Sequence, residues 1–165
     1  MTKKETAFSK DLPNKKITVV KAFDASLEQV WEAWTNSEIL DQWWAPKPYH
    51  TETKSMDFKE GGLWLYAMVS PEGDRSWCKE AFTTIDFHYL ITNTVGFCDE
   101  EGKDSPDFPV MNWTKEFNRT ADGTTVVAEI TFEKLADLEM ITGMGFEEGF
   151  KAGLSNLDQY LDTLS

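Results

Sequence analysis

The sequence has few of the residues that most catalytic and metal centres use. It contains only two histidines, His50 and His88, and two cysteines, Cys78 and Cys98, in 165 residues. The cysteines form no CxxC pair, so we expect two reduced thiols. A GxSxG elbow, an HExxH motif and a phosphate-binding glycine loop are also missing, since Gly61-Gly62 is typical of a hairpin turn. We therefore assign no catalytic residue, metal centre or cofactor.

Positive charge is scarce as well. Sixteen Lys and Arg residues face 29 Asp and Glu residues, which gives a net charge of −13. Such a chain repels the phosphates of nucleic acids and anionic membrane surfaces. No apolar run is long enough to span a bilayer, and residues 1–16 lack the apolar segment of a secretory signal. These absences predict a cytoplasmic protein that binds neither nucleic acid nor membranes.

Aromatic side chains, by contrast, are abundant. They make up 13% of the residues and include seven Trp. A chain of 165 residues is about the size of one domain and can bury a core without disulfides. Rings this numerous must fill that core, line a pocket or form an interface with a partner.

The hydrophobic periodicity predicts an α+β domain. Residues 1–14 are expected to be a flexible leader and residues 15–165 a single domain. Ser26 and Gln29 form a capping box at the start of a short helix, and Ser37 is expected to cap a second one that ends before Pro46. The predicted strands cover 17–23, 50–58, 63–70, 76–85, 89–97, 110–118 and 124–133, with an acidic loop at 99–109 and helices at 27–35, 37–45 and 137–163. Adjacent strands with short turns indicate an antiparallel sheet.

The predicted last helix is unusual because it contains four glycines, each of which disfavours a helix interior by about 1 kcal/mol relative to Ala. Gly145, Gly149, Ala152 and Gly153 form a strip of small residues beside an apolar stripe that includes Phe150. Such a strip allows either close packing of the helix or a cavity between helix and sheet, and both interpretations stay open. A helix that begins only near Phe146, after a loop containing Gly143 and Gly145, is a further alternative.

Four segments together resemble one known family. Residues 24–34 (DASLEQVWEAW) are similar to the strand-to-helix signature of START-like proteins. The segments 40–46 (LDQWWAP), 56–62 (MDFKEGG) and 144–150 (MGFEEGF) resemble the tryptophan pair, the hairpin and the C-terminal helix of the branch of that superfamily related to activators of the Hsp90 ATPase. They occur in the family's order over residues 17–164, which is nearly the whole chain.

This resemblance implies a helix-grip (Bet v 1-like) fold. A curved antiparallel sheet of six or seven strands would wrap around a long C-terminal helix, with two short helices after the first strand and a cavity between sheet and helix. Members of the superfamily include lipid carriers, hormone receptors, polyketide cyclases and Hsp90 co-chaperones. The co-chaperones carry a separate N-terminal domain that is not found in this sequence.

Three functions are compatible with these observations. The first is binding of a small hydrophobic or aromatic molecule in the cavity, which pockets lined by apolar side chains favour. The second is a stress-related protein-interaction domain with a protein partner or a homodimer, and the third is a cyclase- or hydrolase-type enzyme that uses a cavity carboxylate or His88. For the first, the predicted cavity residues are Trp43, Trp44, Trp64, Tyr66, Trp77, His88, Trp113, Gly149 and Phe150.

Overall fold

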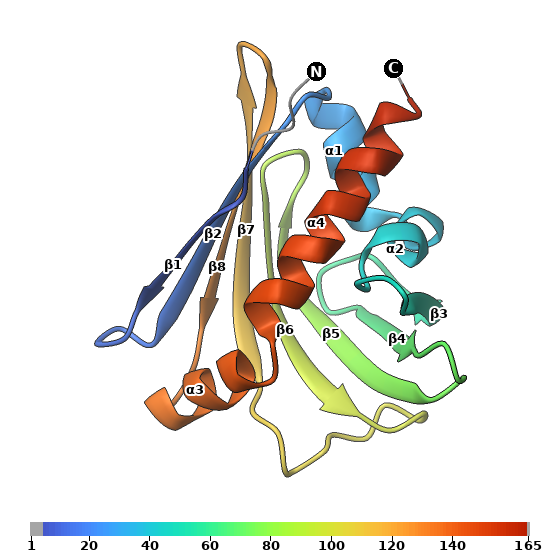
Figure 1. Cartoon of the computed structure of the whole chain (residues 1–165), viewed down its shortest axis with the longest axis vertical. Coiled ribbons are helices and arrows are strands. Elements are labelled where there is room, and N and C mark those ends of the chain that lie inside the picture. Colours follow the sequence, from blue (N-terminus) through green and yellow to red (C-terminus); the bar gives the residue numbers. More distant parts are fainter. Residues whose placement is uncertain (1–4, 165) are drawn as a thin grey trace.

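The computed structural model describes residues 5–164, which form a curved sheet that grips a C-terminal helix (Figure 1). The elements follow in the order β1 (Ala7–Asp11), β2 (Lys16–Phe23), α1 (Leu27–Thr35), α2 (Ser37–Trp43), β3 (His50–Met56), β4 (Leu63–Val69), β5 (Arg75–Asp86), β6 (Leu90–Cys98), β7 (Met111–Thr120), β8 (Gly123–Thr131), α3 (Leu135–Gly143) and α4 (Phe146–Asp162). Helix α4 crosses the concave face of the sheet, and α1 and α2 lie beside it. The predicted α+β helix-grip fold is confirmed.

The sheet is antiparallel throughout and has the strand order β1-β2-β8-β7-β6-β5-β4-β3. Strands β3 to β8 pair in sequence order as a meander, and β2 pairs with the other edge of β8. The described part of the chain therefore contributes eight strands, where the family resemblance implied six or seven.

Strand β1 corrects the prediction of a flexible leader. Residues 1–4 lie outside the described residues, but Ala7–Asp11 pairs antiparallel with β2 along its whole length. Phe8 on this strand packs against Phe146 of α4, with ring centroids 6.1 Å apart. The ordering comes from the sheet edge offered by β2, which local propensity in a polar segment does not reveal.

The two short helices share one capping residue. Ser26 and Gln29 form the predicted capping box of α1, with the Ser26 hydroxyl accepting from the Gln29 backbone N–H. The N-cap of α2 is Asn36 and not the predicted Ser37, because the Asn36 side chain accepts from two backbone N–H groups of the first turn. Asn36 also ends α1, so the chain turns between the helices with no intervening loop.

The C-terminal region is two helices and not the single helix predicted for 137–163. Helix α3 ends at Gly143, and Gly145 adopts a left-handed conformation (φ 88°) directly before α4. A left-handed residue cannot continue a right-handed helix, so the direction changes there. The alternative start near Phe146 is correct, but Gly143, which that alternative placed in a loop, is the last residue of α3.

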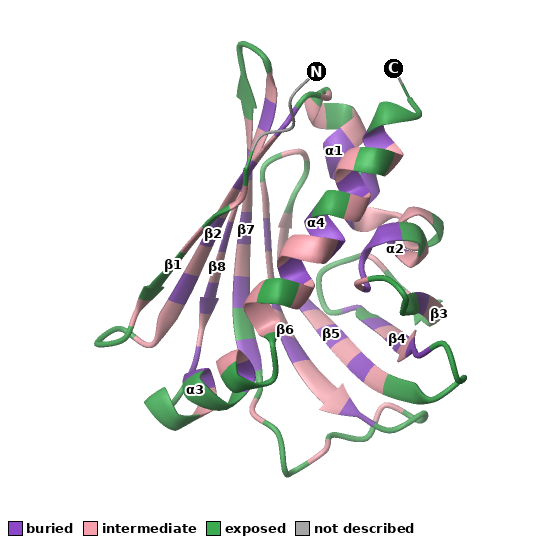
Figure 2. Ribbon diagram, viewed as in Figure 1, coloured by how far each residue is buried: buried purple, intermediate pink, exposed green. Residues whose placement is uncertain are grey.

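The core lies between the concave face of the sheet and helices α1, α2 and α4, where buried positions alternate along the strands (Figure 2). Trp34, Trp43 and Trp44 meet there in edge-to-face contacts with centroids 4.9–6.0 Å apart. The acidic loop after β6 folds over the outer face, since Lys79 Nζ donates to the Gly102 carbonyl at 2.9 Å. No helix between residues 5 and 164 is long and apolar enough to cross a membrane.

Candidate functional site

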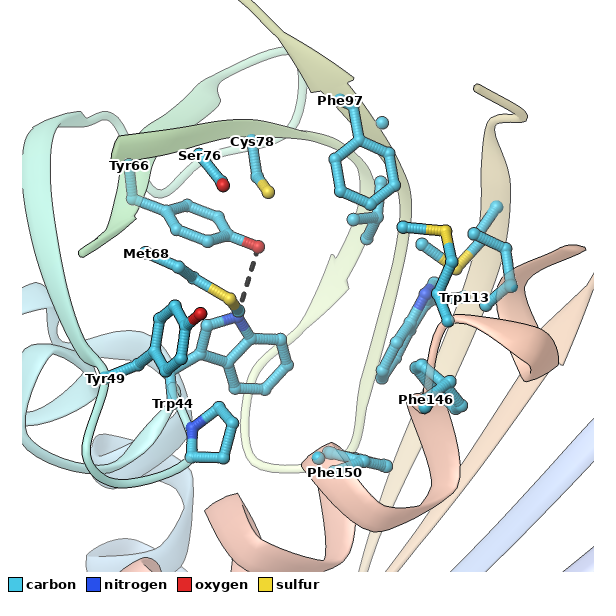
Figure 3. A pocket seen from close by; sticks show the side chains of 18 residues that line it. Trp44, Tyr49, Tyr66, Met68, Ser76, Cys78, Phe97, Trp113, Phe146 and Phe150 are labelled. Carbon is cyan, nitrogen blue, oxygen red and sulfur yellow. Dashed lines mark hydrogen bonds between the residues drawn. The ribbon is translucent and has the colours of Figure 1, made fainter. Parts of the chain in front are cut away.

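A cavity of about 430 Å³ separates α4 from the concave face of the sheet. Its walls come from the segment after α2, from β4 to β7, and from α3 and α4 (Figure 3). Ring contacts hold part of this wall in place, because Phe150 of α4 packs edge-on against Trp113 of β7 and Trp44, with centroids 5.4 and 6.0 Å apart. The cavity therefore lies where the aromatic side chains of the core do not fill the space between α4 and the sheet.

One side of the cavity reaches solvent. Tyr49, Ser76 and Met144 line it and are themselves exposed, with Tyr49 at 44% and Met144 at 52%. These residues belong to the segment after α2, the start of β5 and the junction of α3 with α4. The mouth therefore lies between short or turning segments, while the deep wall is made of strands and the long helix.

Five of the nine predicted cavity residues line this space. They are Trp44, Tyr66, Trp113, Gly149 and Phe150. They come from four elements or their ends, which the sheet curvature brings together around α4.

The other four candidates lie elsewhere. Trp43 is in the core and donates to the Ala33 carbonyl at 2.9 Å. Trp64 stacks on Tyr66 from the side away from the cavity lining, with its nitrogen donating to Thr53 at 3.0 Å. Trp77 is half-buried, with the Lys54 ammonium 5.9 Å from its ring centroid, and it lies on the face of β5 opposite to its buried neighbour Cys78.

His88 is the fourth candidate and is far from the cavity lining in the fold. It sits in the turn between β5 and β6 with a positive φ of 64°, stacked on Phe87 and edge-on to Trp31. The predicted strands 76–85 and 89–97 already left His88 in the connection between them, so its choice as a cavity residue did not follow from the predicted elements.

The Tyr66 hydroxyl is a buried polar group of the cavity wall (Figure 3). It accepts a hydrogen bond from Trp44 Nε1 at 3.1 Å and donates one to the Glu80 carboxylate at 3.3 Å. Burial raises the pKa of Tyr66 well above its ordinary value, and Cys78 and Glu80 raise it further. The hydroxyl therefore stays protonated and acts as a hydrogen-bonding group in the wall.

Behind Tyr66 lies a buried ion pair. Glu80 is 1% exposed, accepts from the Asn93 amide at 3.1 Å and faces the Lys115 ammonium at 3.9 Å. Burial raises the pKa of Glu80 even though Lys115 opposes this, and burial lowers the pKa of Lys115. Neither side chain lines the cavity, so the Glu80 carboxylate contacts the Tyr66 hydroxyl but is not the cavity carboxylate that the enzyme hypothesis required.

Cys78 lines the cavity close to Tyr66 but is a poor nucleophile. Burial raises its pKa to about 12, which keeps the thiol protonated at neutral pH. Residues 5–164 also contain no group of three His, Cys, Asp or Glu side chains placed to hold a metal ion.

The indole nitrogen of Trp113 has no hydrogen-bond partner among the described residues. Trp113 is 3% exposed and lines the cavity. Trp43, Trp44 and Trp64 nearby all donate to oxygen atoms of the protein. Trp34 Nε1 is also without a partner within the described chain, but that residue lies outside the cavity lining.

The small-residue strip of α4 divides between the two predicted roles. A Cβ added at Gly153 would lie 3.1 Å from the Trp44 carbonyl oxygen and 3.3 Å from that of Trp43, so Gly153 serves close packing against the end of α2. A Cβ at Gly149 would meet only Pro46 Cγ at 3.8 Å, and Gly149 lines the cavity. Gly145 also lines the cavity, so close packing holds for Gly153 and cavity formation for Gly145 and Gly149.

Several lining residues were not among the predicted ones. They are Pro46, Tyr49, Met68, Ser76, Cys78, Val95, Gly96, Phe97, Met111, Ile141, Met144, Gly145 and Phe146. The alternation of Trp64, Tyr66 and Met68 would have been enough to place Met68 on the inner face. Nothing in the sequence places Ile141 or Met144 there, because their position depends on the bend at Gly145.

Comparison with known proteins gives one family and a consistent set of structures. The family model described as "Activator of Hsp90 ATPase homolog 1-like protein" matches residues 24–162. A comparison with curated proteins gives no match.

Solved structures match over nearly the whole chain. A protein from Arthrobacter aurescens is 27% identical with a TM-score of 0.90, covering 95% of this chain and 91% of its own. One from Staphylococcus epidermidis is 25% identical with a TM-score of 0.83, covering 96% and 94%. Protein Ms6760 from Mycobacterium smegmatis is 24% identical with a TM-score of 0.88, covering 94% and 96%, and this likeness shows the fold alone.

Proposed function

The chain belongs to the Activator of Hsp90 ATPase homolog 1-like family, and we propose that it binds one small, largely apolar molecule in the cavity between the sheet and α4. The observation that carries the proposal is the cavity itself. Protein interiors are packed like organic crystals and leave few voids larger than a water molecule. A space of about 430 Å³ falls within the range of small-molecule pockets.

The lining indicates the chemistry of the ligand. Trp44, Trp113 and Phe150 present ring surfaces, which favour a planar or aromatic molecule through burial and ring stacking. Polar groups are few and uncharged, namely the Tyr66 and Tyr49 hydroxyls, Ser76 and Cys78. A charged ligand would lose its hydration without gaining an ion pair, so the proposed ligand is neutral.

A fluorescence titration with N-phenyl-1-naphthylamine, a neutral aromatic probe that brightens in apolar surroundings, tests this function. The blocking variant is Gly149→Leu, which puts a side chain into the cavity at a helical position with room for its Cβ. Its matched control is Gly143→Leu, at the exposed end of α3, where an added Cβ meets no atom of the described chain within 4 Å.

We expect saturable binding by the wild-type protein and by Gly143→Leu, and at least a tenfold loss of affinity for Gly149→Leu. Circular dichroism spectra of both variants serve as the control that they are folded. Absence of saturable binding to the wild-type protein, or equal binding by both variants, would contradict the proposal.

A further inference from the structure

We propose that the cavity ligand is amphipathic, with an apolar body inside the cavity and one uncharged polar end, a hydroxyl or carbonyl group, that hydrogen-bonds at the mouth to Tyr49 and Ser76. The inference rests on the proposed function and adds the polarity and the orientation of its ligand. It starts from where the polar side chains of the cavity lie. Tyr49 and Ser76 line the open side, and both are exposed.

The interior of the cavity offers a ligand few polar groups. Tyr66 is 1% exposed, and its hydroxyl is already bonded to Trp44 and Glu80. Trp113 Nε1 is fully buried and out of reach of a ligand. Cys78 is buried and carries a thiol, which is a weak donor and a weak acceptor. A polar ligand group placed here would lose its hydration without a strong replacement.

The deep wall of the cavity is apolar. Val95 of β6, Met111 of β7 and Ile141 of α3 line it, and each is at most 6% exposed. Burial of apolar ligand surface against these side chains is favourable, because it removes that surface from water. The apolar body of the ligand therefore fits the interior of the cavity better than its mouth.

The two hydroxyls at the mouth are available to a ligand. No hydrogen bond joins the Tyr49 or the Ser76 hydroxyl to another described residue. Ser76 lies on the same face of β5 as Cys78, two residues further on. Figure 3 shows both hydroxyls pointing from the wall toward the space that it encloses. A hydroxyl can both donate and accept, so it can bond either a hydroxyl or a carbonyl group.

The surroundings of the mouth favour an uncharged end. Among the described residues, the cavity lining includes no Asp, Glu, Lys, Arg or His. Arg75, which precedes Ser76 in β5, is paired with Glu52 at 2.7 Å. A charged end would therefore gain no ion pair from the lining, whereas an uncharged end loses less hydration on binding.

Two probes of the same skeleton isolate the polar end. 2-Ethylnaphthalene has no hydrogen-bonding group, and 2-(2-naphthyl)ethanol adds one terminal hydroxyl. Their dissociation constants are measured by displacement of N-phenyl-1-naphthylamine, whose own affinity is first titrated for each protein. The proteins are the wild type, the double variant Tyr49→Phe/Ser76→Ala and the matched control Tyr89→Phe/Ser155→Ala. Tyr89 and Ser155 are also exposed but do not line the cavity.

We expect the affinity for the alcohol relative to the hydrocarbon to fall about fivefold in Tyr49→Phe/Ser76→Ala, the effect of one net hydrogen bond, and to stay unchanged in the control. Nuclear Overhauser effects in the wild-type complex report the orientation without any substitution. The methylene group beside the alcohol should contact the ring protons of Tyr49, and the naphthalene protons should contact the methyl groups of Val95 and Ile141.

An unchanged relative affinity in Tyr49→Phe/Ser76→Ala, or an equal fall in the control, would overturn the inference while leaving cavity binding intact. The reverse orientation, with the methylene group next to Val95 and Ile141, would do the same. Failure of the alcohol to displace N-phenyl-1-naphthylamine that itself binds would also overturn it. Absence of binding by all three molecules would overturn the proposed function together with the inference.

Discussion

Trp44 donates its indole N–H to the hydroxyl of Tyr66 across 3.1 Å, which joins the end of α2 to the middle of β4 inside the core. The same hydroxyl donates to Glu80, so one atom links the cavity wall to the buried ion pair. Both tryptophan and tyrosine line the cavity. The cavity therefore depends on this bond for its shape as well as for its polarity.

Replacing Tyr66 with Phe should destabilise the fold by about 1–3 kcal/mol, because Trp44 Nε1 loses its acceptor in a buried site. Urea unfolding measures the change. Tyr89→Phe is the matched control, since Tyr89 is 47% exposed. Equal midpoints for the two variants would contradict the structural role of the Trp44–Tyr66 bond.

Glu80 should make the free energy of unfolding depend on pH. Its folded-state pKa is raised above the ordinary value of 4.5, so the folded state holds this proton more tightly than the unfolded state. Its contribution to stability is present below pH 4.5 and is lost as the pH rises through the folded-state pKa.

The variant Glu80→Gln lacks this titration. Its free energy of unfolding, measured by urea at several pH values, should improve relative to that of the wild-type protein as the pH rises from 4.5. The lowered pKa of Lys115 acts in the same direction, because loss of the Glu80 charge lowers it further. If the free energies of unfolding of the two proteins differed by the same amount at every pH, the pKa of Glu80 would not be raised by burial in the folded state.

Two glycines of α4 should respond oppositely to alanine. Gly149→Ala should gain up to about 1 kcal/mol from helix propensity, since its Cβ meets Pro46 only at ordinary contact distance. Gly153→Ala should lose stability, because its Cβ would press on the backbone carbonyl of Trp44 at 3.1 Å. The two variants are compared by their midpoints of thermal unfolding. Equal shifts of the midpoint would contradict the close approach of α4 to the end of α2.

Strand β1 should contribute measurably to stability. Phe8→Ala removes a ring that packs on Phe146 and lies 5.7 Å below the Lys151 ammonium, and we expect a loss of about 1–2 kcal/mol for this half-buried side chain. Leu12→Ala, at a position 49% exposed just after the strand, is the control. A loss no larger than that of the control would mean that β1 does not hold Phe8 against α4.

Local signals in the sequence were sufficient for most of the fold. The capping box at Ser26 and the alternation through Trp64 and Tyr66 depend on neighbouring residues alone, and both predictions agree with the structure. The bend at Gly145 depends on one backbone conformation, and β1 depends on a partner strand. Neither is encoded in local periodicity, so both were mispredicted or left open.

The site was predictable only where the residue type itself indicated burial. Trp44 and Trp113 were proposed as cavity residues because large rings seek a core or pocket, and the structure places both at the cavity. The same reasoning named Trp43 and Trp77, which lie in the core and on the outer face. The direction of a ring depends on the twist of the sheet and the angle of a helix, which composition does not determine.

Intermolecular nuclear Overhauser effects between N-phenyl-1-naphthylamine and the methyl groups of the protein would locate a ligand between the sheet and α4. We expect contacts from the probe to the methyls of Val95, Met68 and Ile141, which line the cavity from three separate elements. Contacts confined to exposed methyls such as those of Leu63 or Leu12 would place the probe on the surface and contradict it.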